Sequence, residues 1–395
     1  MRVLGIDPGS KSLDICGLCD GEICFEASVD TAEAARKPEK VLEKISEFGR
    51  IDLLAAPSGY GVGPVILSQI PLEVFEEFYY TFILASTKDD INSAIEAGVA
   101  GARIYHAMAQ ITRAIRVSNI PSIFIPGVIN LPTVPLHRKI NRVDLGTADK
   151  LAVVALGIEE LAREMGAYEK VNYIHVEMGY GYNAVIAVRN GVIVDGVGGT
   201  LMPGPAYLTA GSLDLEVAQA IGSFGKHHVF TTGCASITGS SSIEEWVSSA
   251  NTSELHEICL KAMLESVIKA VYQLLYAVRS PSRIILSGRV AKIPDIYAYL
   301  SEELERIAPV VYLENMKPKS VKETAYGYAV VADGLAGGVY RDLVKHMEIP
   351  SATGSSLDYI VVKDFFDTRL GRSFVRLRRY LRGRAFNEFL WRSTL

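Results

Sequence analysis

The sequence contains no apolar run long enough to cross a membrane. Its longest apolar stretches, such as residues 151–158, are far shorter than the roughly 20 residues that a spanning helix requires. A strand-like segment begins at residue 2, so we expect no cleavable leader ahead of the fold and predict a cytoplasmic protein. Cysteine is scarce as well: the chain has five, without the repeated spacing of a metal site, and we interpret Cys16 and Cys19 as strand residues of a hairpin.

The net charge of the chain is small, but the charged residues are unevenly distributed. The formal net charge is -5, yet the residues from 351 onward carry nine Lys/Arg against four Asp/Glu, which leaves about -10 on the rest of the chain. A main body of that sign disfavours nucleic-acid binding. In the tail, apolar residues alternate with arginines at helical spacing, which predicts an amphipathic segment that docks on the acidic body or on a second copy, with a homodimer as one outcome.

The length of 395 residues favours two domains. A strand-turn-strand-turn-strand pattern begins near residue 3 and recurs near residue 172, where an Asn190-Gly191 dipeptide joins two apolar runs. We therefore predict an α/β protein with domains at 1–165 and 166–345. Residues 346–395 are expected to form a linker, rich in Ser and Gly over 351–356, and a basic helical tail.

Further periodic segments complete this outline. Apolar spacing predicts helices over residues 38–48, 89–118, 146–165, 254–279 and 321–339, and strands over residues 51–56, 121–125, 283–287 and 310–313. The cleft between two such domains is a favoured ligand site.

The first hairpin turn has the composition of a phosphate-binding loop. Gly9, Ser10, Lys11 and Ser12 follow the strand that ends at Asp7, and a tight Gly/Ser turn presents backbone N–H groups to phosphate oxygens. Asp7 is placed to hold hydrated Mg²⁺, which needs only one or two carboxylates. The alternative is an ordinary hairpin turn.

An equivalent turn occurs in the second unit. Glu177 ends a strand and is followed by Gly179, Gly181 and Asn183. The same arrangement on both units favours phosphate binding over coincidence.

A later strand, residues 284–287, runs into Gly288, where the backbone can approach a flat adenine, and Arg289 can stack on it. We therefore assign Gly288 and Arg289 to nucleotide binding, with a plain strand-to-helix turn as the alternative.

Candidate acceptor residues lie in two loops. Ser58 and Gly59 follow the strand at 51–56, while His137, Arg138 and Arg142 precede the helix that begins near residue 146. An arginine fork matches carboxylate or phosphate oxygens, so we assign these loops to substrate, against the alternative of surface charge.

The order of these motifs resembles the actin-like ATPase and kinase superfamily. Asp7-x-Gly-Ser, Glu177-x-Gly-x-Gly and Leu286-Ser-Gly are similar to its phosphate 1, phosphate 2 and adenosine motifs, and the helix around Gly327 is similar to its second connecting motif. The resemblance implies two ribonuclease H-like domains that face each other across a nucleotide cleft, and ATP and Mg²⁺ as cofactors. It also implies a nucleotide contact for Gly327.

A narrower resemblance concerns residues 199–214, which are similar to the acetate and butyrate kinase branch. The whole chain resembles an uncharacterised, largely archaeal family labelled butyrate kinase. This resemblance implies a kinase of a small carboxylate, with catalytic roles for Asp7 and Glu177. The branch has an arginine that clamps the carboxylate, and that position is Ala210 here.

Two other functions stay open. Gly146-Thr147-Ala148-Asp149-Lys150 resembles the helix start of type III pantothenate kinases, which implies a hydroxyl acceptor with Asp149 as its base. The structural alternative is an acid that stabilises a helix N-terminus beside a solvated Lys150. The second possibility is an ATPase switch or assembly protein that acts through the basic tail.

Overall fold

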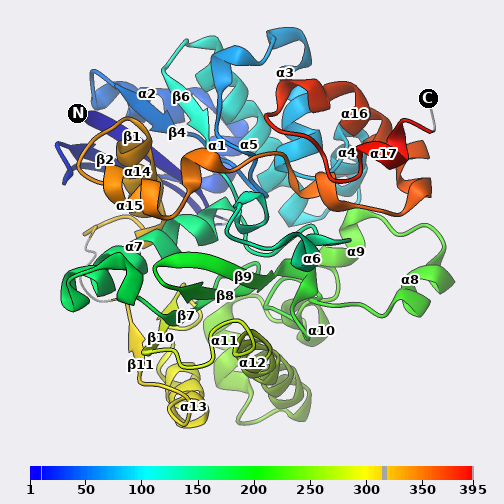
Figure 1. Cartoon of the computed structure of the whole chain (residues 1–395). Helices are drawn as coiled ribbons and strands as arrows, with labels where there is room; N and C mark the ends of the chain where they lie inside the picture. The colour runs from blue at the N-terminus through cyan, green and yellow to red at the C-terminus, as the bar shows by residue number, and fades with distance from the viewer. Residues whose placement is uncertain (10, 314–317, 394–395) are drawn as a thin grey trace.

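The computed structural model describes residues 1–9, 11–313 and 318–393 of the chain, and within them two mixed β-sheets are covered by helices (Figure 1). The strand order of the first sheet is β3 (Glu22–Asp30), β2 (Ser12–Cys19), β1 (Arg2–Pro8), β4 (Leu53–Ala55), β6 (Ser122–Phe124) and β5 (Val65–Ile66). The order of the second is β11 (Val310–Tyr312), β10 (Arg283–Ser287), β7 (Tyr173–Met178), β8 (Asn183–Arg189) and β9 (Val192–Gly198).

The two sheets are built on one plan. The order β3-β2-β1-β4-β6 of the first corresponds strand by strand to β9-β8-β7-β10-β11 of the second. In each, the first strand pairs antiparallel with the second and parallel with a later strand. The predicted internal repeat and α/β class are therefore confirmed.

The hairpin turns have the backbone that their sequences predict. Asp20 and Gly21, between β2 and β3, have φ of 49° and 86°, and Asn190 and Gly191, between β8 and β9, have φ of 54° and 71°. Two successive residues with positive φ form the turn that matches the twist of paired strands.

The helices follow most of the predicted periodicity. In the first part of the chain they are α1 (Thr31–Arg36), α2 (Glu39–Glu47), α3 (Leu72–Phe78), α4 (Lys88–Glu96), α5 (Ala100–Val117), α6 (Leu136–Lys139) and α7 (Ala148–Met165). They continue with α8 (Leu215–Ile221), α9 (Lys226–Phe230), α10 (Cys234–Thr238), α11 (Ile243–Ser249), α12 (Glu254–Leu274), α13 (Pro294–Leu304), α14 (Glu323–Leu335), α15 (Arg341–His346), α16 (Arg369–Leu377) and α17 (Glu388–Trp391). In the part of the chain that the structure describes, none is long and apolar enough to span a membrane.

One predicted helix is divided in two. The helix expected over residues 89–118 is interrupted between α4 and α5 by Gly98, whose φ of 80° is outside the helical range. Apolar spacing does not reveal the break because both helices turn their apolar residues to the same core.

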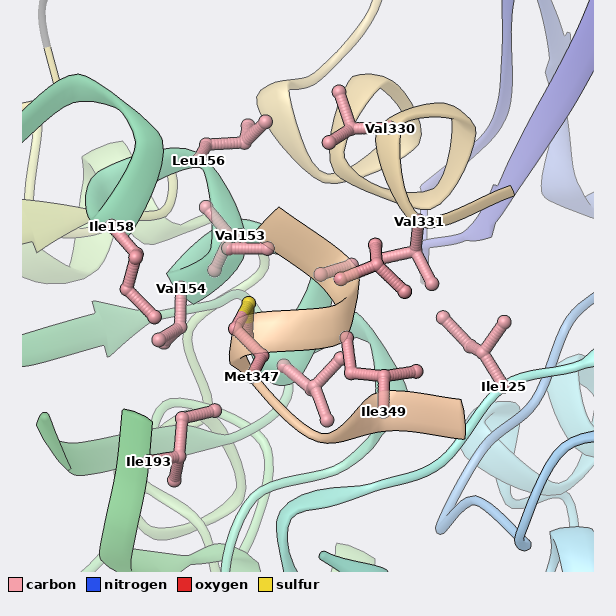
Figure 2. Packing of buried hydrophobic residues seen from close by; sticks show 14 of the residues in the cluster. Ile125, Val153, Val154, Leu156, Ile158, Ile193, Val330, Val331, Met347 and Ile349 are labelled. Carbon is pink, nitrogen blue, oxygen red and sulfur yellow. The ribbon is translucent and has the colours of Figure 1, made fainter. Parts of the chain in front are cut away.

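Helix α14 packs closely against both α7 and β1. A Cβ at Gly327 would lie 2.3 Å from the carbonyl oxygen of Ala152 in α7, and one at Gly5 would lie 2.2 Å from the amide nitrogen of Ala329. Figure 2 shows Val153, Leu156 and other α7 side chains meeting those of α14 and of the segment that carries Met347 and Ile349. Gly327, for which the resemblance implies a nucleotide contact, is buried where α14 meets α7 and does not line the cavity described below; a side chain there would separate the two helices.

The stretch expected to be a linker is part of the core. Ala352, Ser355 and Ser356 are fully or almost fully buried. The N–H of Gly63 donates to the carbonyl of Gly354, and Val62 and Ser355 form a β-bridge. Small residues occur here because two backbones approach closely, so the linker interpretation is wrong.

The basic tail docks on the main body, as predicted. Figure 1 shows α16 and α17 beside α3 and α4 of the first unit. Phe374 is fully buried against Phe82, and Arg376 and Ser373 both contact Glu77 of α3. Most of the apolar face of the tail is thus covered within one chain, although Phe389 is exposed. Formation of a homodimer stays a prediction.

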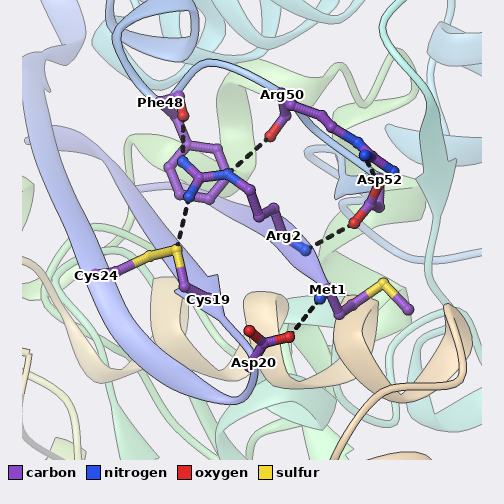
Figure 3. The surroundings of a disulfide bond; sticks show 8 residues. All are labelled: Met1, Arg2, Cys19, Asp20, Cys24, Phe48, Arg50 and Asp52. Carbon is purple, nitrogen blue, oxygen red and sulfur yellow. Dashed lines mark hydrogen bonds and ion pairs between the residues drawn. A yellow bond between two sulfur atoms is a disulfide. The ribbon is translucent and has the colours of Figure 1, made fainter.

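A disulfide joins Cys19 and Cys24 across the β2–β3 turn (Figure 3). The β2–β3 register shifts between Gly17 and Leu18, which leaves Cys24 as the extra residue of a β-bulge. Arg2 packs on Phe48 and donates to the Cys19 sulfur at 3.0 Å. Cys16 and Cys19 do lie in the strand β2, as predicted, but the pairing of Cys19 was not foreseen.

Candidate active site

A cavity of about 600 Å³ lies between the two sheets and is walled by both repeated hairpins. Most of the predicted site residues line it: Asp7, Gly9, Lys11, Ser12, Gly59, Asp149, Glu177, Gly179, Gly181, Asn183, Gly288 and Arg289. They come from the β1–β2 turn, the β4–β5 loop, the β7–β8 turn, the start of α7 and the end of β10. Ser10 lies outside the described residues.

Four predicted substrate residues are not brought to this cavity. Ser58 is fully buried, and its hydroxyl donates to the Ala56 carbonyl and accepts from the Ile125 N–H, so it stabilises the loop. Arg138 donates to the Val194 carbonyl and pairs with Asp195. His137 and Arg142 precede α7 on the exposed surface. The loop packs on β9 rather than at the cleft, because Arg138 finds its partners there.

Asp7 lies at the end of β1, buried beside a lysine that the sequence did not indicate. The Lys322 ammonium is 3.1 Å from one Asp7 carboxylate oxygen and 3.7 Å from an oxygen of Asp14 on β2. Burial raises the pKa of Asp7, and the charge of Lys322 opposes that rise. The cavity wall thus carries two adjacent carboxylates and one cation at the first predicted phosphate loop.

Lys150 occupies the corresponding place beside the second loop. Its ammonium is 2.5 Å from Asp149 and 2.9 Å from Glu177, and it is almost completely buried. Burial opposes ionisation of Asp149, but Lys150 and the Thr147 hydroxyl outweigh it and hold the pKa of Asp149 below its ordinary value. The interpretation of Lys150 as a solvated neighbour is therefore wrong.

Asp144 also lines the cavity and was not identified from the sequence. One of its oxygens accepts from the Gly146 N–H at 2.8 Å, and burial raises the pKa of Asp144 to about 6. It is a buried acid that changes charge near neutral pH. Its position in a short loop before α7 gave no periodic signal.

This raised pKa predicts a pH-dependent stability difference for Asp144→Asn. Between the ordinary pKa of 3.8 and about 6 the folded state keeps a proton that the unfolded state has released, so rising pH lowers stability. Asparagine avoids this loss and retains an oxygen for Gly146. We expect D144N to be more stable than wild type by up to about 3 kcal/mol at pH 7.5 and equal to it at pH 4. Urea unfolding at both pH values checks this, and a difference that does not grow with pH would contradict it.

The second loop holds a polar side chain that lacks a partner. Asn183 is 2% exposed, and neither its amide nitrogen nor its oxygen forms a hydrogen bond within the described residues. A buried amide without partners is costly. Because Asn183 lines the cavity, a polar ligand such as a phosphate group or a metal-bound water can form the hydrogen bonds that its amide lacks.

The donor set fits Mg²⁺ and nucleotide. Carboxylate oxygens of Asp7 and Asp14 are the hard ligands that Mg²⁺ prefers, and Mg²⁺ keeps several waters, so no larger cluster is needed. Within residues 1–9, 11–313 and 318–393, no group of three His, Cys, Asp or Glu is arranged as a metal site.

At Gly288, φ is 88° and a Cβ would lie 2.3 Å from the Met178 carbonyl oxygen, so only glycine fits beside β7.

Comparison with known proteins gives a family. A model described as "Protein of unknown function (DUF1464)" matches residues 5–362. The chain belongs to this family. No curated protein matches the sequence.

Solved kinases share the fold of this DUF1464 protein. The propionate kinase from Francisella tularensis subsp. tularensis SCHU S4 is 12% identical, with a TM-score of 0.56 over 83% of this chain and 98% of that one. The Porphyromonas gingivalis acetate kinase is 15% identical (TM-score 0.54, 84% and 98%), and the Entamoeba histolytica acetate kinase is 10% identical (TM-score 0.53, 78% and 87%). The predicted two-domain actin-like fold is confirmed.

Part of the cavity wall in this DUF1464 protein is aromatic. Tyr60, Tyr105, Tyr182 and Phe230 line it, and the Tyr105 and Tyr182 hydroxyls are 3.1 Å apart. Position 210, the alanine noted in the sequence, donates its N–H to Val229 of α9, the helix that supplies Phe230. These aromatic residues come from separate loops and helices, so no local motif indicated them.

Proposed function

We propose that this protein transfers the γ-phosphoryl group of Mg-ATP to a small carboxylate. The observation that carries the proposal is the convergence of equivalent parts of two repeated units on one cavity. Each unit contributes a glycine turn and a carboxylate near a strand end, and a lysine from the other unit pairs with each carboxylate: Lys322 with Asp7, and Lys150 with Glu177.

The roles follow from charge and position. Backbone N–H groups of the two turns are suited to phosphate oxygens, and Lys150 and Lys322 are suited to offset negative charge during transfer. Asp7 and Asp14 would hold Mg²⁺, which supplies further charge neutralisation when bound. A carboxylate acceptor is already ionised at neutral pH, so its oxygen can bond to phosphorus, with ADP as the leaving group, without a base.

A hydroxyl acceptor is the second candidate, and Asp144 favours it. A base for a hydroxyl works best when its pKa is near the operating pH, and Asp144 has a pKa of about 6. Asp149, the base predicted from the sequence, has both oxygens engaged by Lys150 and Thr147 and a lowered pKa. If a hydroxyl is the acceptor, Asp144 is therefore the better base.

Binding and turnover with defined acceptors test the proposal. We expect Mg-ATP to bind at submillimolar concentration in calorimetry, and ADP release to depend on an added acceptor from a series of short-chain carboxylates. The matched straight-chain alcohols form the control series. Absence of binding at millimolar Mg-ATP would contradict the proposal, as would ADP release that no acceptor stimulates, which is the behaviour of an ATPase switch.

A further inference from the structure

The aromatic part of the cavity wall combines apolar rings with tyrosine hydroxyl groups. We define the tyrosine cluster as Tyr60, Tyr105 and Tyr182, all of which line the cavity. Phe230 packs edge-on against Tyr105 and Tyr182, with ring centroids 5.8 and 6.0 Å apart. The same cavity is lined by the aliphatic side chains Ile83, Leu84, Ile104 and Met108. Side chains of this kind suit a short aliphatic chain better than a sugar.

A lysine, Lys226, lies against this cluster. The Lys226 ammonium is 5.5 Å from the ring centroids of both Tyr60 and Tyr105, and it donates to the Tyr60 hydroxyl at 3.4 Å. Within the described part of the chain, Lys226 forms no ion pair with a carboxylate. An ammonium group has three donors, and one tyrosine oxygen satisfies only one of them. The remaining donors are free to bind an anion.

We propose that Lys226 binds the carboxylate of the acceptor, with the Tyr60 hydroxyl as a second contact, and that the aliphatic chain of the acceptor lies against the tyrosine cluster and Met108. The proposal rests on the proposed function and identifies the residue that selects its substrate class. An ammonium partly shielded from water by aromatic rings attracts an anion more strongly than a solvated one. Alcohols of the same chain length lack the charge and bind weakly.

Direct binding of carboxylates tests this site without nucleotide. The probes are straight-chain carboxylates from acetate to hexanoate and the matched alcohols, followed by calorimetry or tyrosine fluorescence. We expect carboxylate binding in the wild type, a loss of roughly 10- to 100-fold in affinity for Lys226→Gln, and near-normal affinity for Lys226→Arg. Tyr60→Phe should weaken binding less than K226Q does. Lys261→Gln, on the exposed side of α12, is the matched control and should bind as the wild type does.

The outcomes separate this site from the proposed function. In turnover assays K226Q should raise KM for the carboxylate while kcat and the Kd for Mg-ATP stay unchanged. Acceptor-dependent phosphorylation with an unaltered KM in K226Q would support the kinase and overturn the role of Lys226. Lys226-dependent carboxylate binding without any Mg-ATP binding would support this site and contradict the kinase. If no carboxylate of the series binds, or if alcohols bind equally well, the role of Lys226 is overturned.

Discussion

Replacing Asp7 with asparagine is expected to lower kcat by roughly 10²- to 10³-fold while the free energy of unfolding changes by less than about 1 kcal/mol. Asp7 is buried, and burial raises its pKa, which means that the charged carboxylate destabilises the folded state. The nearby charge of Lys322 offsets part of this cost. Asparagine removes that charge without changing the shape, and Asp14 remains near Lys322. The loss should therefore appear in catalysis, where the carboxylate is proposed to hold Mg²⁺.

Kinetics, Mg²⁺ titration and urea unfolding of the same preparations test this expectation. The Asp7→Asn protein should need more Mg²⁺ to reach half-maximal rate. Asp20→Asn is a suitable control, because Asp20 lies in the exposed β2–β3 turn and asparagine accepts its positive φ. Unchanged turnover in D7N, or a loss of activity explained by unfolding, would contradict the role of Asp7.

Replacing Arg378 with methionine is expected to destabilise the protein by about 3–5 kcal/mol. Arg378 and Asp358 are both nearly fully buried, and two guanidinium nitrogens lie 2.7–3.0 Å from the carboxylate. Arg378 also donates to three backbone carbonyls, those of Leu381, Arg382 and Gly383. Methionine leaves a buried carboxylate and these carbonyls without their donor, so the tail should loosen from the body.

Urea unfolding measures this effect, with the next residue as the matched control. Arg379 is exposed and contacts only the neighbouring Tyr380 among the described residues, so Arg379→Met should stay within about 0.5 kcal/mol of wild type. Arg378→Lys keeps the charge but not the planar guanidinium, so its loss of stability should lie between those of R378M and R379M. A loss below 1 kcal/mol in R378M would show that the buried pair does not hold the tail.

Local signals account for the parts of the fold that the sequence predicted. Asp20-Gly21 and Asn190-Gly191 set their own turn geometry, and a repeat of strands and glycine turns is visible without knowing the contacts. The sequence indicated the residues of the two glycine turns that line the cavity, because they follow strand ends in the two equivalent units.

The remaining site residues depend on contacts that no local pattern encodes. Lys322 meets Asp7 across 315 positions of sequence, and Lys226 reaches Tyr60 across 166. The Ser/Gly-rich composition of residues 351–356 led to the wrong prediction of a linker, because small residues occur in tightly packed segments as well as in flexible linkers. Gly327 had the same ambiguity, since a glycine that admits a neighbouring helix looks like one that admits a ligand.

The order of the two units along the chain has a consequence for synthesis. The strands and helices from β7 to β11 occupy the continuous stretch 173–312, whereas the first sheet needs α14 and the tail, which extend to residue 391. A ribosome-bound chain that ends at residue 345 therefore contains the whole second sheet, but Phe82 of the first unit still lacks its contact with Phe374. The first sheet is therefore completed after the second, by segments that follow the second sheet along the chain.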